Sequence, residues 1–232
     1  AAMKLTLYLM AGSGLIIPGI LMLYSSSGLF TFNMVQLHGV VFAPWIQKIA
    51  FVFMFLGFGV LAGVWPFHTW SPVGHVAAPT AVSMLHAGVL MKLGAFAILR
   101  VAMYLCPQGF QYWAQFMGLL AAVGIVYGVF VGLAQTDLKY VIGYSSVSHM
   151  GLVGLGLATG TNEGLNGAVF QMFAHGVMTA LFFSAVGFIY DRTHTRDILE
   201  LGGFSKIMPV ASAFFITAAL CGAGVPGMAS FW

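Results

Sequence analysis

Charged residues are scarce in this chain. Only 6% of its 232 residues are Asp, Glu, Lys or Arg, whereas 60% are hydrophobic, and the mean hydropathy is +0.98. Soluble domains are about 25% charged, so this chain lacks the polar side chains that would cover a globule in water. Glycine is abundant, at 30 residues, and it is more frequent in membrane helices than in soluble ones. The composition therefore predicts a protein of the lipid bilayer.

The chain is also poor in residues that enzymes use for catalysis or metal binding. Its two cysteines, Cys106 and Cys221, show no CxxC or Cys/His ligand spacing, so neither a metal nor a disulfide is indicated. We expect both to be buried and inert. The net charge of +3 is scattered, which argues against nucleic acid as a partner. The five acidic residues fall at the ends of apolar segments or between them: Asp137, Glu163, Asp191, Asp197 and Glu200. The sequence thus holds no paired carboxylates for hydrolysis and no visible cofactor site.

Seven apolar segments are each near the roughly 20 residues that a membrane-spanning helix needs. They are residues 5–24, 49–64, 79–105, 112–134, 138–158, 167–190 and 209–232. No long polar loop separates them, so we expect one transmembrane domain over residues 1–232, built as an all-α bundle without a soluble module. The absence of an initiating methionine and the apolar ending at Trp232 indicate a fragment that is incomplete at both ends.

Helix breakers stand at two places in these segments. Pro79 begins the third segment, and Pro226 lies in the glycine-rich residues 222–227 of the seventh. An interrupted helix at membrane depth is tolerated only where it is buried in protein or lines a wet cavity. We therefore predict a discontinuous helix in the seventh segment.

Basic residues predict the orientation of the segments. Lys48 and Arg100 fall at segment ends on one side of the membrane. Five others fall on the opposite side: Lys4, Lys139, Arg192, Arg196 and Lys206. By the positive-inside rule, the side with five basic residues is cytoplasmic.

Lys92 stands in the middle of the third segment. It is thirteen positions from either end of residues 79–105, too far for its amine to reach water easily. A lysine at a helix centre costs about 2.5–3.5 kcal/mol to insert and usually faces the bundle interior or an aqueous path. Burial disfavours the charged form of an amine, so Lys92 is suited to exchanging a proton near neutral pH. The alternative is a structural donor to helix carbonyls.

Two histidines, His149 and His175, lie within the fifth and sixth segments. Histidine can both give and take a proton at physiological pH. A single membrane histidine is more often part of a hydrogen bond between helices, but two of them beside a mid-membrane lysine favour a relay. We therefore predict a proton path through Lys92, His149 and His175.

Other polar residues are weaker candidates for this path. Four are additional candidates: His86, Tyr144, Ser148 and Lys139. Three histidines lie in connections, where a surface or interfacial position is the simpler interpretation: His68, His75 and His194.

Four strings resemble a known family. They are Pro66-Phe67-His68-Thr69-Trp70 followed by Ala78-Pro79-Thr80-Ala81; Ala87-Gly88-Val89-Leu90-Met91-Lys92; Gln135-Thr136-Asp137-Leu138-Lys139 leading to Tyr144-Ser145-Ser146-Val147-Ser148-His149-Met150-Gly151; and Tyr190-Asp191-Arg192-Thr193-His194-Thr195-Arg196-Asp197. In this order and spacing they resemble the antiporter-like membrane subunits of complex I, closest to the subunit 4 (M-type) branch. Those subunits are similar to subunits of Mrp-type sodium/proton antiporters and membrane hydrogenases.

The resemblance implies about fourteen spanning helices in two inverted repeats with broken helices near the membrane centre, as in secondary transporters. The seven segments would be the sixth to twelfth of these helices. The family's central lysine falls on Lys92, and its two channel histidines fall on His149 and His175. An exit-side glutamate is expected two residues after Trp232.

The chain departs from the family pattern in two places. The family usually has a second lysine five residues before the Pro-Phe-His string, and this position is Leu61. That lysine pairs with a glutamate on the preceding helix, which would lie before Ala1. The usual Pro-Asp-Ala-His reads Pro72-Val73-Gly74-His75. Half of the usual proton switch is therefore missing or rebuilt, for instance around His86.

The sequence thus predicts a proton-translocating subunit of a respiratory NADH:quinone oxidoreductase, in an energy-transducing membrane such as the bacterial inner membrane. No cofactor is expected in this chain; NADH, FMN, iron–sulfur clusters and quinone belong to partner subunits. One alternative is a subunit of an Mrp-type antiporter or membrane hydrogenase. The other is a membrane scaffold that conducts no protons, for which Leu61 is the best argument.

Overall fold

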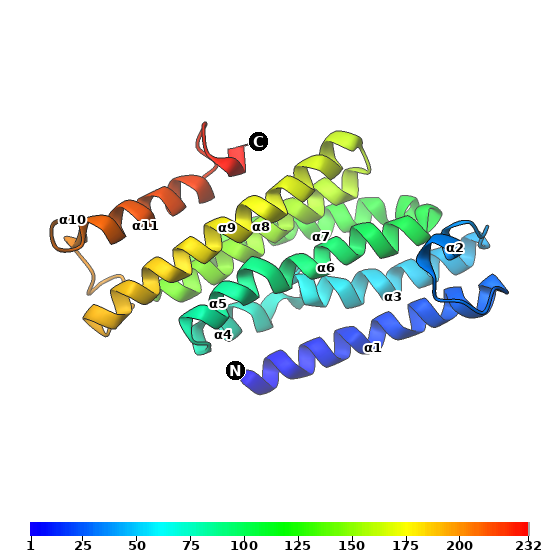
Figure 1. Ribbon diagram of the computed structural model, residues 1–232, viewed down its shortest axis with the longest axis horizontal. Helices are drawn as coiled ribbons and strands as arrows, with labels where there is room; N and C mark the ends of the chain where they lie inside the picture. Colours follow the sequence, from blue (N-terminus) through cyan, green and yellow to red (C-terminus); the bar gives the residue numbers. More distant parts are fainter. Residues whose placement is uncertain (232) are drawn as a thin grey trace.

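The structure, a computed structural model, describes residues 1–231, and this part of the chain is helical almost throughout. The long helices lie along the longest axis of the molecule (Figure 1). Within residues 1–231 no β-strand occurs, and the one isolated bridge joins Asp137 to Asp197. The predicted all-α bundle is therefore confirmed.

Six stretches of residues 1–231 are helical, long enough and apolar enough to cross a membrane. They are α1 (Ala2–Ser27); Pro44–Ala77, with α3 (Pro44–Ala62) and α4 (Trp70–Ala77); Thr80–Met103, with α5 (Thr80–Leu85) and α6 (Met91–Ala97); α7 (Pro107–Leu133); α8 (Leu138–Thr159); and α9 (Asn162–Thr193). The shorter helices are α2 (Met34–His38), α10 (Phe204–Ile207) and α11 (Pro209–Gly222).

In the seventh predicted segment, residues 209–232, the helix α11 is interrupted after Gly222, in agreement with the predicted discontinuous helix. The 14 residues of α11 cover about 21 Å at 1.5 Å per residue, less than the roughly 30 Å of a hydrocarbon core. The chain then turns through Gly224 and Gly227, which have φ values of 67° and 93°, before the 3-10 turn η4 (Ala229–Phe231). Glycine adopts such left-handed conformations without steric cost, so the breaker string around Pro226 ends the helix.

The second span is longer than the predicted residues 49–64, and it is broken. α3 ends at Gly63, whose φ of 70° lies in the left-handed region. The short turn η1 (Phe67–Thr69) then leads into α4. The indole N–H of Trp70 donates a hydrogen bond of 2.8 Å to the carbonyl of Val60, which holds α4 against the end of α3. The chain therefore stays in the bundle after Gly63.

This broken helix overturns the prediction that His68 and His75 lie at the surface. Their side chains are 2% and 0% exposed, because η1 and α4 pack inside the bundle. α4 lies against α8, where a Cβ on Gly143 would be 3.0 Å from Pro72. His194 does lie at the surface, as predicted.

The third span is irregular along its length. α4 ends at Ala77, and Pro79 precedes the first residue of α5. Two π-helical turns then interrupt the α-helix, η2 (His86–Leu90) and η3 (Ile98–Met103). π-turns are rare and frequently occur at functional sites. The first of them, η2, ends two residues before Lys92.

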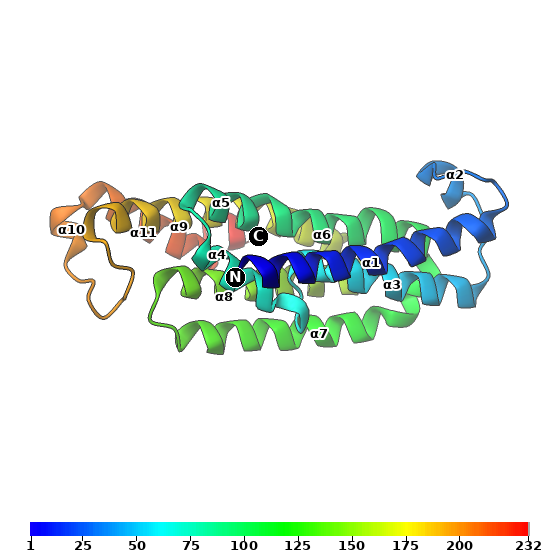
Figure 2. The same cartoon turned by 90° about the horizontal axis from the view of Figure 1, so that it is seen from below.

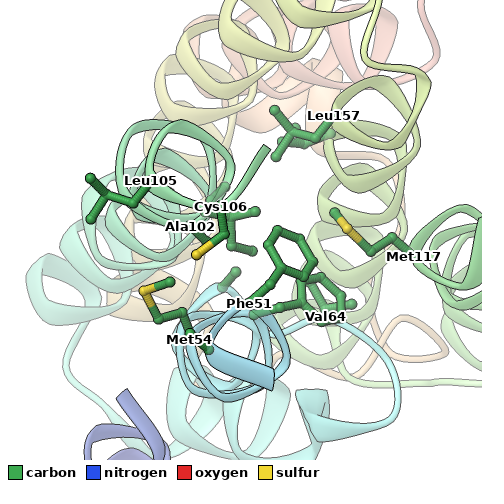
Figure 3. Close-up of a cluster of buried hydrophobic side chains, with 14 of the residues drawn as sticks. Phe51, Met54, Val64, Ala102, Leu105, Cys106, Met117 and Leu157 are labelled. Atoms are coloured by element: carbon green, nitrogen blue, oxygen red, sulfur yellow. The ribbon is translucent and has the colours of Figure 1, made fainter. Parts of the chain in front are cut away.

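The packing forms layers. α7 lies on one face of the bundle and α5, α6 and α9 on the opposite face, with α3 and α8 between them (Figure 2). Apolar side chains such as Phe51, Met54 and Met117 fill the core beside Cys106 (Figure 3). Cys106 is buried as predicted, but Cys221 is only half-buried, because it lies on the peripheral helix α11.

One end of the bundle gathers basic residues around the α4–α5 break. The Lys139 amine donates a hydrogen bond of 2.8 Å to the Ala78 carbonyl, and Arg196 donates one of 3.3 Å to the Val76 carbonyl. Arg196 also forms an ion pair of 3.3 Å with Asp137. Cations near the C-terminal end of a helix are favourable, since its last carbonyls carry partial negative charge. The basic end of the bundle is therefore also the end where α4 stops.

Close packing between α3 and α6 gives a testable prediction. A Cβ on Gly94 would lie 2.4 Å from the amide nitrogen of Ala62 and 2.6 Å from the carbonyl oxygen of Phe58. Backbone atoms cannot move aside as a side-chain tip can, so Gly94→Ala should destabilise the full-length subunit by about 1–3 kcal/mol. Thermal unfolding in detergent measures the change.

The matched control for this prediction is Gly59→Ala. Gly59 is also a buried helical glycine, but a Cβ there would meet no atom within 4 Å. This variant should be neutral or stabilising by up to about 1 kcal/mol, because alanine favours helix. Equal thermal stability of the two variants would contradict the packing described here.

Candidate functional site

Lys92 and His175 are in direct contact at the centre of the bundle. Lys92 lies in the first turn of α6, and His175 lies midway along α9. The Lys92 amine donates a hydrogen bond to the carbonyl of Ala87 and forms a second one with Nδ1 of His175. His175 is fully buried, and its Nε2 has no hydrogen-bond partner among residues 1–231. The contact therefore joins a half-buried titratable amine to a fully buried titratable imidazole.

The π-turn η2 provides the carbonyl that holds the amine. Within η2 the Met91 N–H bonds to the carbonyl of His86, five residues earlier, instead of following the α-helical spacing. The wider turn leaves the Ala87 carbonyl within reach of the Lys92 side chain. This hydrogen bond to a carbonyl of its own helical segment fixes the position of the Lys92 amine relative to α9.

Two glycines set the distance between α9 and this turn. A Cβ on Gly176 would lie 2.9 Å from the carbonyl oxygen of Gly88, and a Cβ on Gly88 would lie 3.4 Å from that of Gly176. The two backbones are therefore almost in contact. Because Gly176 follows His175 in the chain, this approach brings the imidazole up to Lys92.

His149, on α8, continues the group of titratable side chains. Its ring centroid is 5.0 Å from that of His175. Nδ1 of His149 forms a hydrogen bond of 2.9 Å with the side-chain amide of Gln171. If the amide NH₂ is the donor, Nδ1 is the unprotonated ring nitrogen and the proton resides on Nε2. Gln171, which the sequence analysis did not single out, thereby orients the ring.

Two cavities reach this group from different sides. Lys92 lines a groove of about 620 Å³ between α5, α6 and α9, whose other walls are mostly apolar side chains such as Leu93 and Phe173. His149 lines a second cavity of about 460 Å³ that also contains Ser145 and Ser148. Cavities with several polar partners can hold ordered water. The second cavity therefore places hydroxyl groups beside His149.

The additional candidates lie in three different places. Ser148 lines the cavity of His149. Tyr144 lies beside His68, with 6.4 Å between ring centroids. Lys139 is 5% exposed and holds the Ala78 carbonyl. The structure thus brings together Lys92, His175, His149 and Ser148, while Tyr144 lies in a separate cluster of aromatic rings.

His75 and His86 form a second pair of rings, near the basic end. Their centroids are 6.1 Å apart. Nε2 of His75 is 3.1 Å from the hydroxyl of Ser71. Hydropathy suggested a surface connection for His75, but the family string Pro72-Val73-Gly74-His75 was a signal that could have pointed to it.

Acidic groups are absent from the site within the described residues. The one salt bridge that occurs in residues 1–231 joins Arg196 to Asp137 at the end of the bundle. Within the same residues, no group of three or more histidine, cysteine, aspartate or glutamate side chains is placed so that it could hold a metal ion. The chemistry that this arrangement can perform is proton exchange among amine, imidazole and hydroxyl groups.

Comparison with known proteins identifies the family. The family described as NADH:quinone oxidoreductase/Mrp antiporter, TM, matches residues 1–232. The chain belongs to this family. It is 39% identical over 231 residues to NADH-quinone oxidoreductase subunit M of Rickettsia conorii, covering 100% of this chain and 47% of that protein. The chain thus spans about half the length of the curated relatives it matches.

Solved structures agree with the family assignment. A chain of respiratory complex I from Thermus thermophilus with bound NADH superimposes with a TM-score of 0.93 and 30% identity, covering 98% of this chain and 49% of that one. The Mrp complex from Dietzia sp. DQ12-45-1b is similar in fold, with a TM-score of 0.87 and 24% identity over 94% of this chain and 40% of that one. Membership of this family makes the chain part of a multi-pass membrane protein.

The contact between Gly176 and Gly88 can be tested with a variant that changes no titratable group. Gly176→Val would push α9 away from η2 and separate His175 from Lys92, because the added atoms meet the Gly88 carbonyl. We expect the full-length subunit to be destabilised by about 1–3 kcal/mol, because the backbone carbonyl cannot move aside. Thermal unfolding in detergent measures the change.

Gly167→Val is the control on the same helix, since a Cβ at Gly167 meets nothing within 4 Å. It carries the same change of side chain and of helix propensity but leaves the contact intact. If both variants lowered the thermal stability equally, the close approach of α9 to η2 would not be the cause.

Proposed function

We propose that this chain is the central part of a proton-translocating membrane subunit of a respiratory NADH:quinone oxidoreductase. The observation that carries the proposal is the Lys92–His175 contact, which joins two proton-exchanging groups inside the bundle, with His149 next in line. The 39% identity to a subunit M supports the assignment to this complex. Redox chemistry, with its cofactors, belongs to other subunits, and this chain carries protons only.

The Lys92–His175 hydrogen bond has two states that differ by the position of one proton. In the first, an ammonium group donates to the lone pair on Nδ1 of His175. In the second, the proton has moved to Nδ1, and a neutral amine accepts from the imidazolium. Lys92 and His175 cannot both be fully protonated, because an ammonium N–H and an imidazolium N–H would then point at each other. The pair therefore carries one positive charge that can move between Lys92 and His175.

From His175 the proton continues to His149. The two rings are adjacent, and His149 opens into the cavity that contains Ser145 and Ser148. Each transfer breaks one N–H or O–H bond and forms another. The direction of travel runs from Lys92 across the bundle toward this hydroxyl-lined cavity.

The energy needed for this transport is modest. Moving one charge against about 100 mV costs about 2.3 kcal/mol, equal to roughly a fifty-fold change in proton affinity at one site. A change of charge near Lys92, caused by quinone reduction in a partner subunit, can supply an effect of this size without a large movement of helices. We place the complex in an energy-transducing membrane, most simply the bacterial inner membrane, with the basic end of the bundle in the cytoplasm.

Two other functions compete with this proposal. The similarity in fold to the Mrp complex favours an ion exchanger as the second candidate, and the set of co-purifying subunits distinguishes it. A scaffold that conducts no protons is the third, and Leu61 in place of the family's usual lysine is the argument for it. The proton-to-electron ratio decides between the scaffold and a conducting subunit.

Replacement of Lys92 tests the proposal. Lys92→Met keeps a long apolar side chain, so the complex should assemble and reduce quinone in detergent. Coupled proton transfer through this subunit should slow by on the order of 10²-fold or more, since the central acid–base group is gone. Proton pumping per electron, measured in sealed vesicles, should fall.

Lys206→Met is the control for this experiment, because Lys206 is an exposed lysine in the short helix α10. It should leave the proton-to-electron ratio unchanged. An unchanged ratio in the Lys92→Met complex as well would remove Lys92 from the path and favour the scaffold.

A further inference from the structure

The side-chain amide of Gln171 occupies one ring nitrogen of His149. The amide nitrogen lies 2.9 Å from Nδ1 of His149, in a hydrogen bond between α9 and α8. Gln171 is half-buried and precedes His175 by four residues on α9, so both side chains lie on the same face of that helix. One face of α9 therefore carries both His175 and the group that holds His149.

The nitrogens that remain determine where the two rings can exchange a proton. Nδ1 of His175 is bound to the Lys92 amine, and its Nε2 is buried without a hydrogen-bond partner among residues 1–231. Nδ1 of His149 is bound to Gln171. The ring centroids are 5.0 Å apart. Because both Nδ1 atoms are occupied, a proton passes from Nε2 of His175 to Nε2 of His149, directly or through one bound water.

The orientation of the Gln171 amide decides whether Nε2 of His149 can accept this proton. A neutral imidazole has one donor nitrogen and one acceptor nitrogen. When the amide NH₂ donates to Nδ1, the hydrogen of His149 is on Nε2, and Nε2 of both rings then carries a hydrogen. When the amide carbonyl accepts from Nδ1–H, Nε2 has a free lone pair. The two orientations have nearly the same shape, since the amide N and O atoms are of similar size.

The surroundings of His149 give the amide this role. Among the described residues, Gln171 is the side chain that forms a hydrogen bond with this ring. The ring is 8% exposed, so bulk water does not readily replace the amide. Hydrogen bonds between membrane helices also contribute to packing, and an experiment has to separate that contribution from control of the ring.

We propose that Gln171 controls the tautomer of His149 and thereby its ability to receive a proton from His175. This inference rests on the proposed function and adds a positioning residue that acts through His149. With the Gln171 carbonyl on Nδ1–H, the Nε2–H bond of protonated His175 breaks as an N–H bond forms at Nε2 of His149. His175 is left neutral, and His149 becomes the cation. With the amide reversed, the same step is blocked.

The matched variants Gln171→Met and Gln171→Glu test this control in the assembled complex. Methionine is also unbranched but cannot hold Nδ1, so we expect Gln171→Met to slow proton translocation by about tenfold, the equivalent of one ordinary hydrogen bond. Glutamate keeps an oxygen that accepts from Nδ1–H, so Gln171→Glu should retain most of the rate. Translocation is measured in sealed vesicles during quinone reduction, and quinone reduction in detergent shows that each complex has assembled. Gln115→Met, the same change at an exposed glutamine of α7, should match the unaltered complex.

Removal of the His149 ring separates control of the tautomer from packing. In a His149→Phe complex Gln171 has no ring nitrogen to hold, so the addition of Gln171→Met should slow translocation no further. If the two changes instead act independently and their effects multiply, Gln171 contributes through packing, and the inference is overturned. Equal slowing by Gln171→Met and Gln171→Glu would overturn it as well.

Comparison with Lys92→Met distinguishes failure of this inference from failure of the proposed function. If Lys92→Met slows translocation while Gln171→Met leaves it unchanged, the proposed function stands and the role of Gln171 is overturned. If Lys92→Met, His149→Phe and Gln171→Met all leave translocation unchanged, the proposed function itself fails.

Discussion

The near contact of two glycine backbones is the constraint on which the rest of the site depends. Where Gly176 meets Gly88, α9 comes close enough for His175 to bind Lys92. Helices in a bilayer gain no hydrophobic free energy by associating with one another, so close packing at small residues is a main source of their attraction. The same contact that holds the two helices together therefore also positions the amine and the imidazole.

The sequence was most informative where a residue costs free energy in a membrane. Lys92, His149 and His175 stood out because polar groups in apolar segments need a reason to be there, and they lie together in the folded chain. Hydropathy failed at His75, because it reports the local composition between Pro66 and Ala78 and not whether the chain remains inside the bundle. The glycine contact was also hidden, since two glycines cannot be distinguished by composition among 30.

Irregular helices explain why a site can form in such an apolar protein. A regular helix uses nearly all its carbonyls internally, whereas each interruption frees one for another donor. At η2 the Ala87 carbonyl binds Lys92, and at the α4–α5 break the Ala78 carbonyl binds Lys139. Pro79 predicts the second interruption from the sequence, whereas the π-turn η2 contains no proline that would predict it. Both lysines thus donate to backbone carbonyls, and within residues 1–231 neither forms a salt bridge with a carboxylate.

The absence of acids in the described interior determines how protons there affect one another. With an effective dielectric constant of about 20, two positive charges as far apart as the rings of His75 and His86, 6.1 Å, repel by about 3 kcal/mol. This exceeds the roughly 2.3 kcal/mol needed to move one charge against 100 mV. Protonation of one group therefore lowers the proton affinity of the neighbouring group. In the proposed path, repulsion among neighbouring cations at fixed positions would therefore couple successive proton transfers.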